Sequence, residues 1–159
     1  MAYFEFDEGH PVDPYHITRT LGMAGMLALS TWDIWARHLA PLVFGTELSV
    51  AALFQEVLGI ESRLQAEFIY LVISLAVLSP AYFFIWRPIM SFLSPTRHWS
   101  IDGLSFGIVI FSIFLLLNAL LGATLSIQLA LLGWFPGVLA SWFMTSLFIR
   151  LREMNCKIV

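Results

Sequence analysis

The sequence predicts an all-α integral membrane protein, a helical bundle of four transmembrane helices with one short interfacial amphipathic helix. Hydrophobic residues make up 59% of the 159 residues, charged residues make up only 12%, and the mean hydropathy is +0.83. Residues 104–121 and 127–149 contain no charged side chain. Each run has about the 20 apolar residues that a helix needs to cross a bilayer.

The two uncharged runs predict an antiparallel hairpin with spans over about residues 103–122 and 127–149. Only the small and polar residues 123–126 separate them, and this break is too short to cross a membrane. A water-soluble fold of this size could hardly hide every face of both helices. The hairpin therefore predicts insertion into a membrane.

A polar acidic arm, residues 1–16, comes first in the chain, and Pro11 and Pro14 work against a helix there. The next segment, about residues 17–40, is rich in glycine and alanine in its apolar part, which favours close helix packing. We interpret it as the first span. The alternative is an interfacial helix that never crosses.

A charge pair marks the outer end of this first segment. Asp33 and Arg37 are spaced i,i+4, with the acid on the N-terminal side, which is the favourable order on a helix. Trp32 and Trp35 flank the pair and are expected to anchor it at the headgroups. An ionisable residue near a membrane core is also a candidate proton or ion relay. Structural pairing of Asp33 with Arg37 is the favoured interpretation.

Two further elements precede the hairpin. Apolar and polar residues alternate at helical spacing over about residues 46–58, which predicts an amphipathic helix lying along the membrane surface. Residues 67–86 form the next predicted span, with a proline kink at Pro80. Trp86 closes this span as an interfacial anchor, and Trp99 has the same role in the loop that follows.

Basic residues predict the orientation. With four spans, six basic residues fall on one side and two on the other, which favours cytoplasmic N- and C-termini in a bacterial inner membrane. The larger group is Arg19, Arg87, Arg97, Arg150, Arg152 and Lys157, and the smaller is Arg37 and Arg63. If residues 17–40 do not cross, Arg19 changes sides. Residues 151–159 form a short cytoplasmic tail in this interpretation, and residues 17–150 form a single transmembrane domain.

Small and amide side chains in the hairpin predict helix packing. Gly103 and Gly107 form one GxxxG motif, and Gly133 and Gly137 form another. Such motifs allow helices to approach closely, within the hairpin or against a neighbouring protein. Asn118 lies well inside the third span, where an amide needs a hydrogen-bond partner on another helix.

The sequence contains no strong signature of catalysis or of a bound cofactor. No histidine lies within a predicted hydrocarbon core, which disfavours an intrinsic haem. A metal site in the arm would use residues whose spacing matches no defined site: Asp7, Glu8, His10, Asp13 and His16. The net charge of −3 suggests no nucleic-acid partner. We therefore expect no catalytic residues and no metal.

The order of elements also supports a resemblance. A glycine- and alanine-rich first helix is followed by the amphipathic link PLVFG…LSVAALFQEVLG, a span that ends near proline, and a hairpin with a glycine-rich start. This order resembles a loose group of small bacterial four-helix integral membrane proteins without assigned function. The resemblance implies the four-span topology and no activity.

Three functional hypotheses follow from the sequence. The first is a non-catalytic accessory subunit of a larger membrane complex, of the respiratory or photosynthetic kind. Its partners are other membrane subunits and lipids, and a lipid, quinone or pigment would bind at a subunit interface. The second is a small oligomeric transporter or channel with Asp33 and Asn118 on its path. The third, a membrane enzyme, is opposed by the lack of converging titratable residues in the core.

Overall fold

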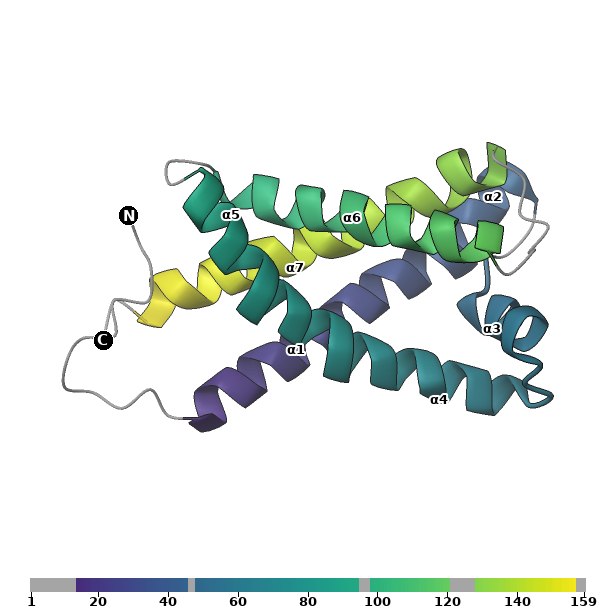
Figure 1. Ribbon diagram of the computed structural model, residues 1–159, viewed down its shortest axis with the longest axis horizontal. Coiled ribbons are helices and arrows are strands. Elements are labelled where there is room, and N and C mark those ends of the chain that lie inside the picture. The colour runs from purple at the N-terminus through teal and green to yellow at the C-terminus, as the bar shows by residue number, and fades with distance from the viewer. Residues whose placement is uncertain (1–13, 46–47, 95–97, 121–127, 157–159) are drawn as a thin grey trace.

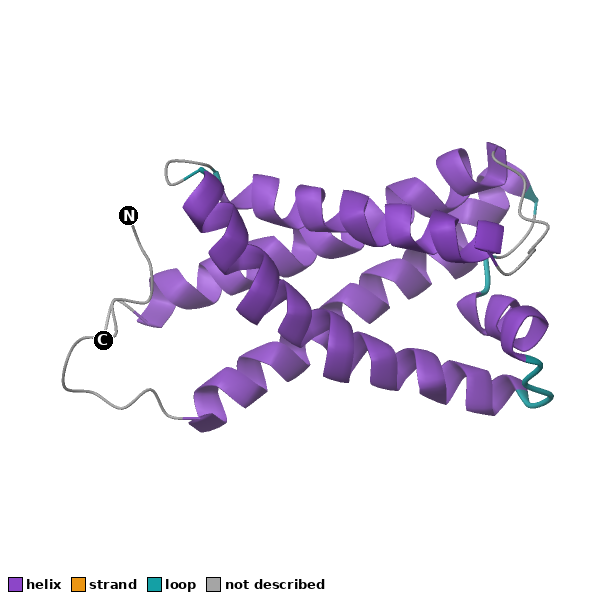
Figure 2. Ribbon diagram, viewed as in Figure 1, coloured by secondary structure: helices purple, strands orange, loops and turns teal. Residues whose placement is uncertain are grey.

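The fold is helical throughout the part of the chain that the structure describes. The computed structural model describes residues 14–45, 48–94, 98–120 and 128–156, and these ranges contain helices and no strand (Figure 2). This finding confirms the predicted all-α class for the described residues.

Four long helical rods and one short helix make up the described structure (Figure 1). The first rod consists of α1 (Pro14–Ile34), the π-helical η1 (Trp35–Leu39) and α2 (Ala40–Phe44). The short helix is α3 (Val50–Leu58). The second rod consists of α4 (Arg63–Ile73), η2 (Ser74–Leu78), η3 (Ala81–Trp86) and α5 (Arg87–Leu93). The third is α6 (Trp99–Leu120), and the fourth is η4 (Leu129–Trp134) with α7 (Phe135–Cys156).

Three helices in the described ranges are long and apolar enough to cross a membrane: Arg63–Leu93, Trp99–Leu120 and Leu129–Arg152. The rod that starts at Pro14 is not among them, and it carries Arg19, Asp33 and Arg37. The second rod extends beyond the expected residues 67–86 at both ends. Three membrane-length apolar helices are consistent with a membrane location.

Each π-helical stretch of the described chain ends two residues before a proline. The stretches η1, η2, η3 and η4 precede Pro41, Pro80, Pro88 and Pro136 respectively. A proline ring clashes with the preceding turn of an α-helix and supplies no backbone N–H. Widening that turn to an i→i+5 pattern relieves the clash and lets the helix continue. The residue before each proline makes this wider bond, as Ala40 N does to Trp35 O.

The rods pack around α7. In Figure 1, α1 and α7 run antiparallel, α6 lies along α7, and the second rod crosses both α1 and α6. The helix α3 lies at the end of the bundle where α1 continues into α2. One core cluster centres on Trp32, Phe111 and Trp134, and a second on Tyr82 and Trp142.

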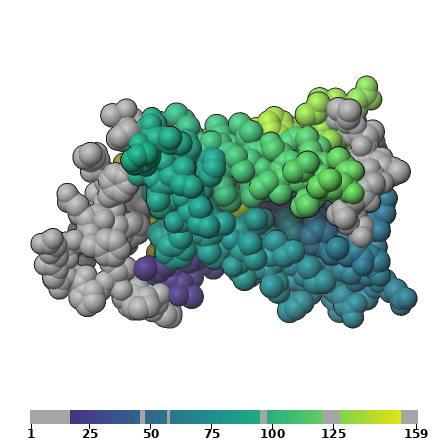
Figure 3. Space-filling model, viewed as in Figure 1, coloured from purple at the N-terminus to yellow at the C-terminus, as the bar shows by residue number. Residues whose placement is uncertain are grey.

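The outer surface of the bundle is apolar over long stretches. Figure 3 shows α6 and the second rod forming one broad face of the molecule. Large hydrophobic side chains are exposed along both rods: Leu64, Phe68, Val72, Val77, Phe84, Ile85, Leu116, Leu117 and Leu120. A soluble monomer rarely exposes apolar patches of this extent.

Candidate functional site

The first GxxxG motif lies between the two helices of the hairpin. A Cβ atom on Gly103 would meet the Trp142 carbonyl of α7 and would come within 2.7 Å of Ser146 Cβ. A Cβ on Gly107 would come within 3.1 Å of Leu139 Cδ2. At Gly103 only glycine leaves room for the contact with α7, whereas at Gly107 an added Cβ would require the Leu139 side chain to shift by a few tenths of an ångström.

The second GxxxG motif faces the first rod and Leu48, which lies just before α3. A Cβ on Gly137 would collide with the Trp35 ring and would come within 2.8 Å of Trp32 Cζ3. The site at Gly133 lies 3.2 Å from Leu48 Cδ1, and the Gly133 carbonyl accepts a 2.7 Å hydrogen bond from Trp35 Nε1. This motif therefore joins the hairpin to the N-terminal half of the chain.

The four tryptophans that were expected as interfacial anchors all contact protein. Trp32 is 6% exposed, and its ring lies 5.1 Å from that of Trp134. Trp86 Nε1 donates to the Asp102 carbonyl at 3.1 Å, and the Trp99 ring lies 5.4 Å from that of Phe143. Trp32 in particular is part of the core and does not face the outside.

The predicted pair of Asp33 and Arg37 is part of a larger charge cluster. Asp33 Oδ1 lies 2.5 Å from Arg37 Nε. Arg37 also approaches Glu67 Oε1 at 3.6 Å, and Arg63 pairs with the same carboxylate at 3.2 Å. Sequence spacing alone pointed to Asp33 and Arg37, whereas Glu67 enters through the packing of α4 near η1. Since the side chains are about half exposed, each pair contributes at most about 1 kcal/mol.

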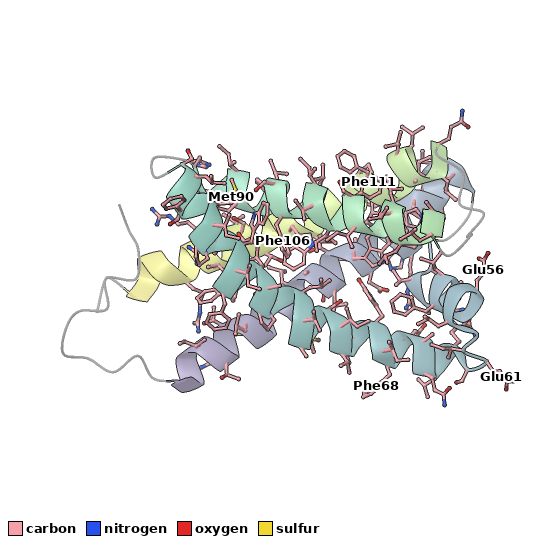
Figure 4. All side chains as sticks on the ribbon, viewed as in Figure 1. Glu56, Glu61, Phe68, Met90, Phe106 and Phe111 are labelled. Carbon is pink, nitrogen blue, oxygen red and sulfur yellow. The ribbon has the colours of Figure 1, made fainter. Side chains whose placement is uncertain are left out.

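Glutamates also mark the end of the bundle where the charge cluster lies. Figure 4 shows Glu56 and Glu61 at the α3 end and Phe68 pointing outward from α4. Phe106 and Phe111 point from α6 into the bundle in the same view. Charged side chains therefore lie at this end of the bundle, and aromatic rings from α6 fill its middle.

Asn118 is buried, but its observed bond is not the expected interhelical one. Its Nδ2 donates to Phe114 O in the preceding turn of α6 at 2.8 Å. Its Oδ1 atom is buried and has no hydrogen-bond partner. The amide thus satisfies its donor within its own helix and leaves an acceptor unused.

Six other polar residues of the described chain are buried between the helices. They are Ser74, Ser79, Asp102, Ser141, Thr145 and Ser146. None of them stands out in the sequence. Serine and threonine are common in membrane helices, and Asp102 lies just outside the expected span over residues 103–122. Only the packing of the helices shows that these side chains are buried.

Histidines and carboxylates do not gather into a metal site in the described ranges. His38 is exposed, and the exposed His98 lies 2.8 Å from Ser100 Oγ. The candidate metal residues Asp7, Glu8, His10 and Asp13 lie outside the described residues, as does the His16 side chain.

Comparison with known proteins finds no matching family model, curated protein or solved structure.

Proposed function

We propose that this protein is an integral membrane protein of four spans that acts as a non-catalytic accessory subunit of a larger membrane complex. Two features support the membrane location, namely apolar outer faces and buried polar side chains. This distribution suits a lipid environment, in which the hydrophobic effect no longer drives apolar side chains inward.

The first rod supports the four-span count because α1 packs antiparallel against α7 in the bundle (Figure 1). Its charged residues lie near its two ends, at Arg19 and at Asp33 and Arg37. The start of α1 and the end of α7 lie at the same end of the bundle, where Arg150 and Arg152 are also located. By the positive-inside rule we place this end in the cytoplasm of a bacterial cell.

The observation that carries the subunit role is the exposed C-terminal half of α6. This half contacts its own chain through Phe114 and Asn118, whereas Ile113, Leu116, Leu117 and Leu120 are exposed. Their i, i+3, i+4, i+7 spacing forms one apolar ridge, which we call the α6 ridge. A ridge of this spacing is suited to pack against a helix of another subunit.

Gentle detergent extraction from native membranes, followed by native gels, mass spectrometry and an absorption spectrum, tests the proposal. We expect the protein to comigrate with a larger complex at fixed stoichiometry. Replacing Leu117 and Leu120 together by alanine should reduce that comigration. The matched control replaces Leu64 and Phe68 on the outer face of α4 by alanine and should leave it unchanged. A homo-oligomer without a partner contradicts the proposal.

The unpaired Oδ1 atom of Asn118 favours a second candidate function, a small oligomeric transporter with Asp33 and Asn118 on its path. An unused buried acceptor in a membrane helix is unfavourable unless it binds something. If this function holds, Asp33→Asn and Asn118→Leu each abolish solute flux in vesicles, whereas Ser30→Ala on the exposed face of α1 does not. Equal flux in all variants contradicts it.

A further inference from the structure

We propose that the end of the bundle where α1 starts and α7 ends binds the phosphate of an anionic phospholipid headgroup. Four arginines of the described chain lie at this end, which we call the arginine end: Arg19, Arg87, Arg150 and Arg152. The inference rests on the proposed membrane location, but it does not depend on a partner subunit.

The contact between α1 and α7 brings arginines from both helices to one level of the bundle. Thr145 Oγ1 lies 3.4 Å from Ala24 O, and the two helices run antiparallel (Figure 1). Arg19 precedes this contact by five residues and Arg150 follows it by five. Because a helix rises about 1.5 Å per residue, both arginines lie about 7–8 Å beyond the contact in the same direction.

The second rod brings Arg87 to the same end. The preceding residue, Trp86, donates from Nε1 to the carbonyl of Asp102 at 3.1 Å, in the first turn of α6. The helix α7 contacts the start of α6 as well, since Ser146 donates a 2.6 Å hydrogen bond to Trp99 O. Arg87 therefore lies level with the start of α6 and close to the level of the last turns of α7.

Carboxylates do not balance the positive charge of the arginine end. Among the side chains that the structure describes, Asp102 carries the one carboxyl group there, and this residue is 6% exposed. The other described carboxylates lie at the α3 end: Asp33, Glu56, Glu61 and Glu67. A planar guanidinium group binds phosphate oxygens through paired hydrogen bonds. The arginine end therefore has the charge and the donors that suit a phosphate group.

One guanidinium group at this end has a buried donor without a partner. Arg152 Nε is buried and makes no hydrogen bond within the described chain. An unpaired buried donor of a charged group is costly, so this position favours an anion that accepts its hydrogen bond. Arg152 is also the last residue of the apolar helix Leu129–Arg152, and the end of a spanning helix lies at the depth of the lipid phosphates. A headgroup phosphate fits this position better than a dissolved phosphate ion.

The acidic arm is the competing occupant of the arginine end. Residues 1–13 lie outside the described residues and precede α1 in the sequence. They carry four carboxylates, which are Glu5, Asp7, Glu8 and Asp13. If the arm occupied the arginine end, the wild type would show no preference for an anionic lipid, and a variant with these four acids replaced by their amides would gain one.

Native mass spectrometry of the full chain in mild detergent tests the proposal, with phosphatidylglycerol and phosphatidylcholine of the same acyl chains as probes. We expect tighter binding of phosphatidylglycerol. Arg152→Gln should weaken that binding about fivefold, as expected for one basic group near an anionic lipid surface, and should leave phosphatidylcholine unaffected. Arg19→Gln, at an exposed position, should act in the same direction. Arg63→Gln is the matched control, since it removes the same charge at the α3 end and should leave both affinities unchanged.

Thermal unfolding verifies that each variant is folded. Equal binding of the two lipids by the wild type, or folded Arg152→Gln and Arg19→Gln variants with wild-type affinity, overturn the proposal. A preference that appears only after the acids of the arm are replaced also overturns it, as does displacement of the bound lipid by inorganic phosphate. Alkaline carbonate extraction of native membranes tests the membrane location separately, because it releases peripheral proteins and leaves integral ones in place.

Discussion

At the residue scale, the short distance between α6 and α7 depends on glycine, which has no side chain. Gly103 places the backbone of α6 against the Trp142 carbonyl, and a backbone carbonyl inside a helix cannot move aside. Gly22, in contrast, has no atom within 4 Å of the position of its missing Cβ. The two glycines therefore have opposite roles, although both lie in apolar helices.

We predict that Gly103→Ala destabilises the protein by about 1–3 kcal/mol, because the added methyl group forces the two helices apart. Gly22→Ala is the control and should stabilise by about 0.5–1 kcal/mol, since alanine restricts the unfolded chain and favours helix. Thermal unfolding in detergent measures both changes. A Gly103→Ala variant as stable as the wild type would show that α6 and α7 can separate without cost.

The charge cluster predicts a much smaller effect at Glu67. Glu67→Gln removes the carboxylate that both Arg37 and Arg63 approach, but these side chains are about half exposed. We expect the free energy of unfolding to fall by less than about 1 kcal/mol, and the difference to shrink at high salt. Unfolding of both proteins at low and high ionic strength measures it. A loss as large as that of Gly103→Ala would mean that water is excluded from the cluster.

The sequence predicts local features of the candidate site better than its long-range contacts. The spacing of Asp33 and Arg37 predicts their pairing because both residues lie on the same face of one helix. The contact of Glu67 with Arg37 and the position of Ser79 against Gly25 depend on how separate helices cross. Nothing in the spacing of serines along an apolar helix distinguishes a packed hydroxyl from one that faces lipid.

At the element scale, π-helical turns explain why the rods remain continuous across their prolines. The sequence predicts a kink at Pro80. In the structure, one π-helical stretch ends just before Ser79 and another begins just after Pro80. The loop expected between the spans at residues 67–86 and 103–122 is helical up to Leu93 and again from Trp99. A proline does not end a helix in the sequence when the wider turn and the neighbouring helices accommodate it.

Pro41 leaves one backbone carbonyl of η1 free to accept a hydrogen bond from the segment just before α3. In the i→i+5 pattern, the donor for Ala36 O would be residue 41, which is proline and has no N–H. Ala36 O instead accepts a hydrogen bond from Leu48 N at 3.2 Å. The Ala36 carbonyl, which has no acceptor role within the first rod, thus binds the segment that leads into α3.

We predict that Pro41→Ala loosens the start of α3. The alanine N–H restores a donor within the helix, which competes with Leu48 N for Ala36 O, and the Leu48 amide should then exchange its hydrogen faster. Hydrogen–deuterium exchange followed by mass spectrometry on peptides that cover α3 measures this. Pro88→Ala is the matched control, since Pro88 also follows a π-helical stretch but lies in α5 of the second rod. Unchanged exchange at Leu48 in Pro41→Ala contradicts the prediction.

At the scale of the whole molecule, charge differs between the two ends of the bundle. Arg19, Arg150 and Arg152 lie at the end where α1 starts and α7 ends, whereas Glu56 and Glu61 lie at the α3 end. The long apolar helices connect these two charged ends. Under the proposed four-span topology the two ends lie on opposite sides of the membrane, and the positive-inside rule favours the cytoplasm for the end with Arg19, Arg150 and Arg152.

The number of spans determines which side each terminus faces, and single cysteines can report it. With four spans, residue 2 and Cys156 are both cytoplasmic, and Glu61 is on the outside. If the first rod does not cross, residue 2 moves outside while Cys156 stays in the cytoplasm. We therefore predict that a membrane-impermeant maleimide added to intact cells labels Glu61→Cys but neither Cys156 nor Ala2→Cys. The engineered cysteines are introduced in a Cys156→Ser background, and permeabilised cells provide the labelling control. Labelling of Ala2→Cys in intact cells would reduce the count to three spans, and would leave α1 to pack against α7 from outside the hydrocarbon region.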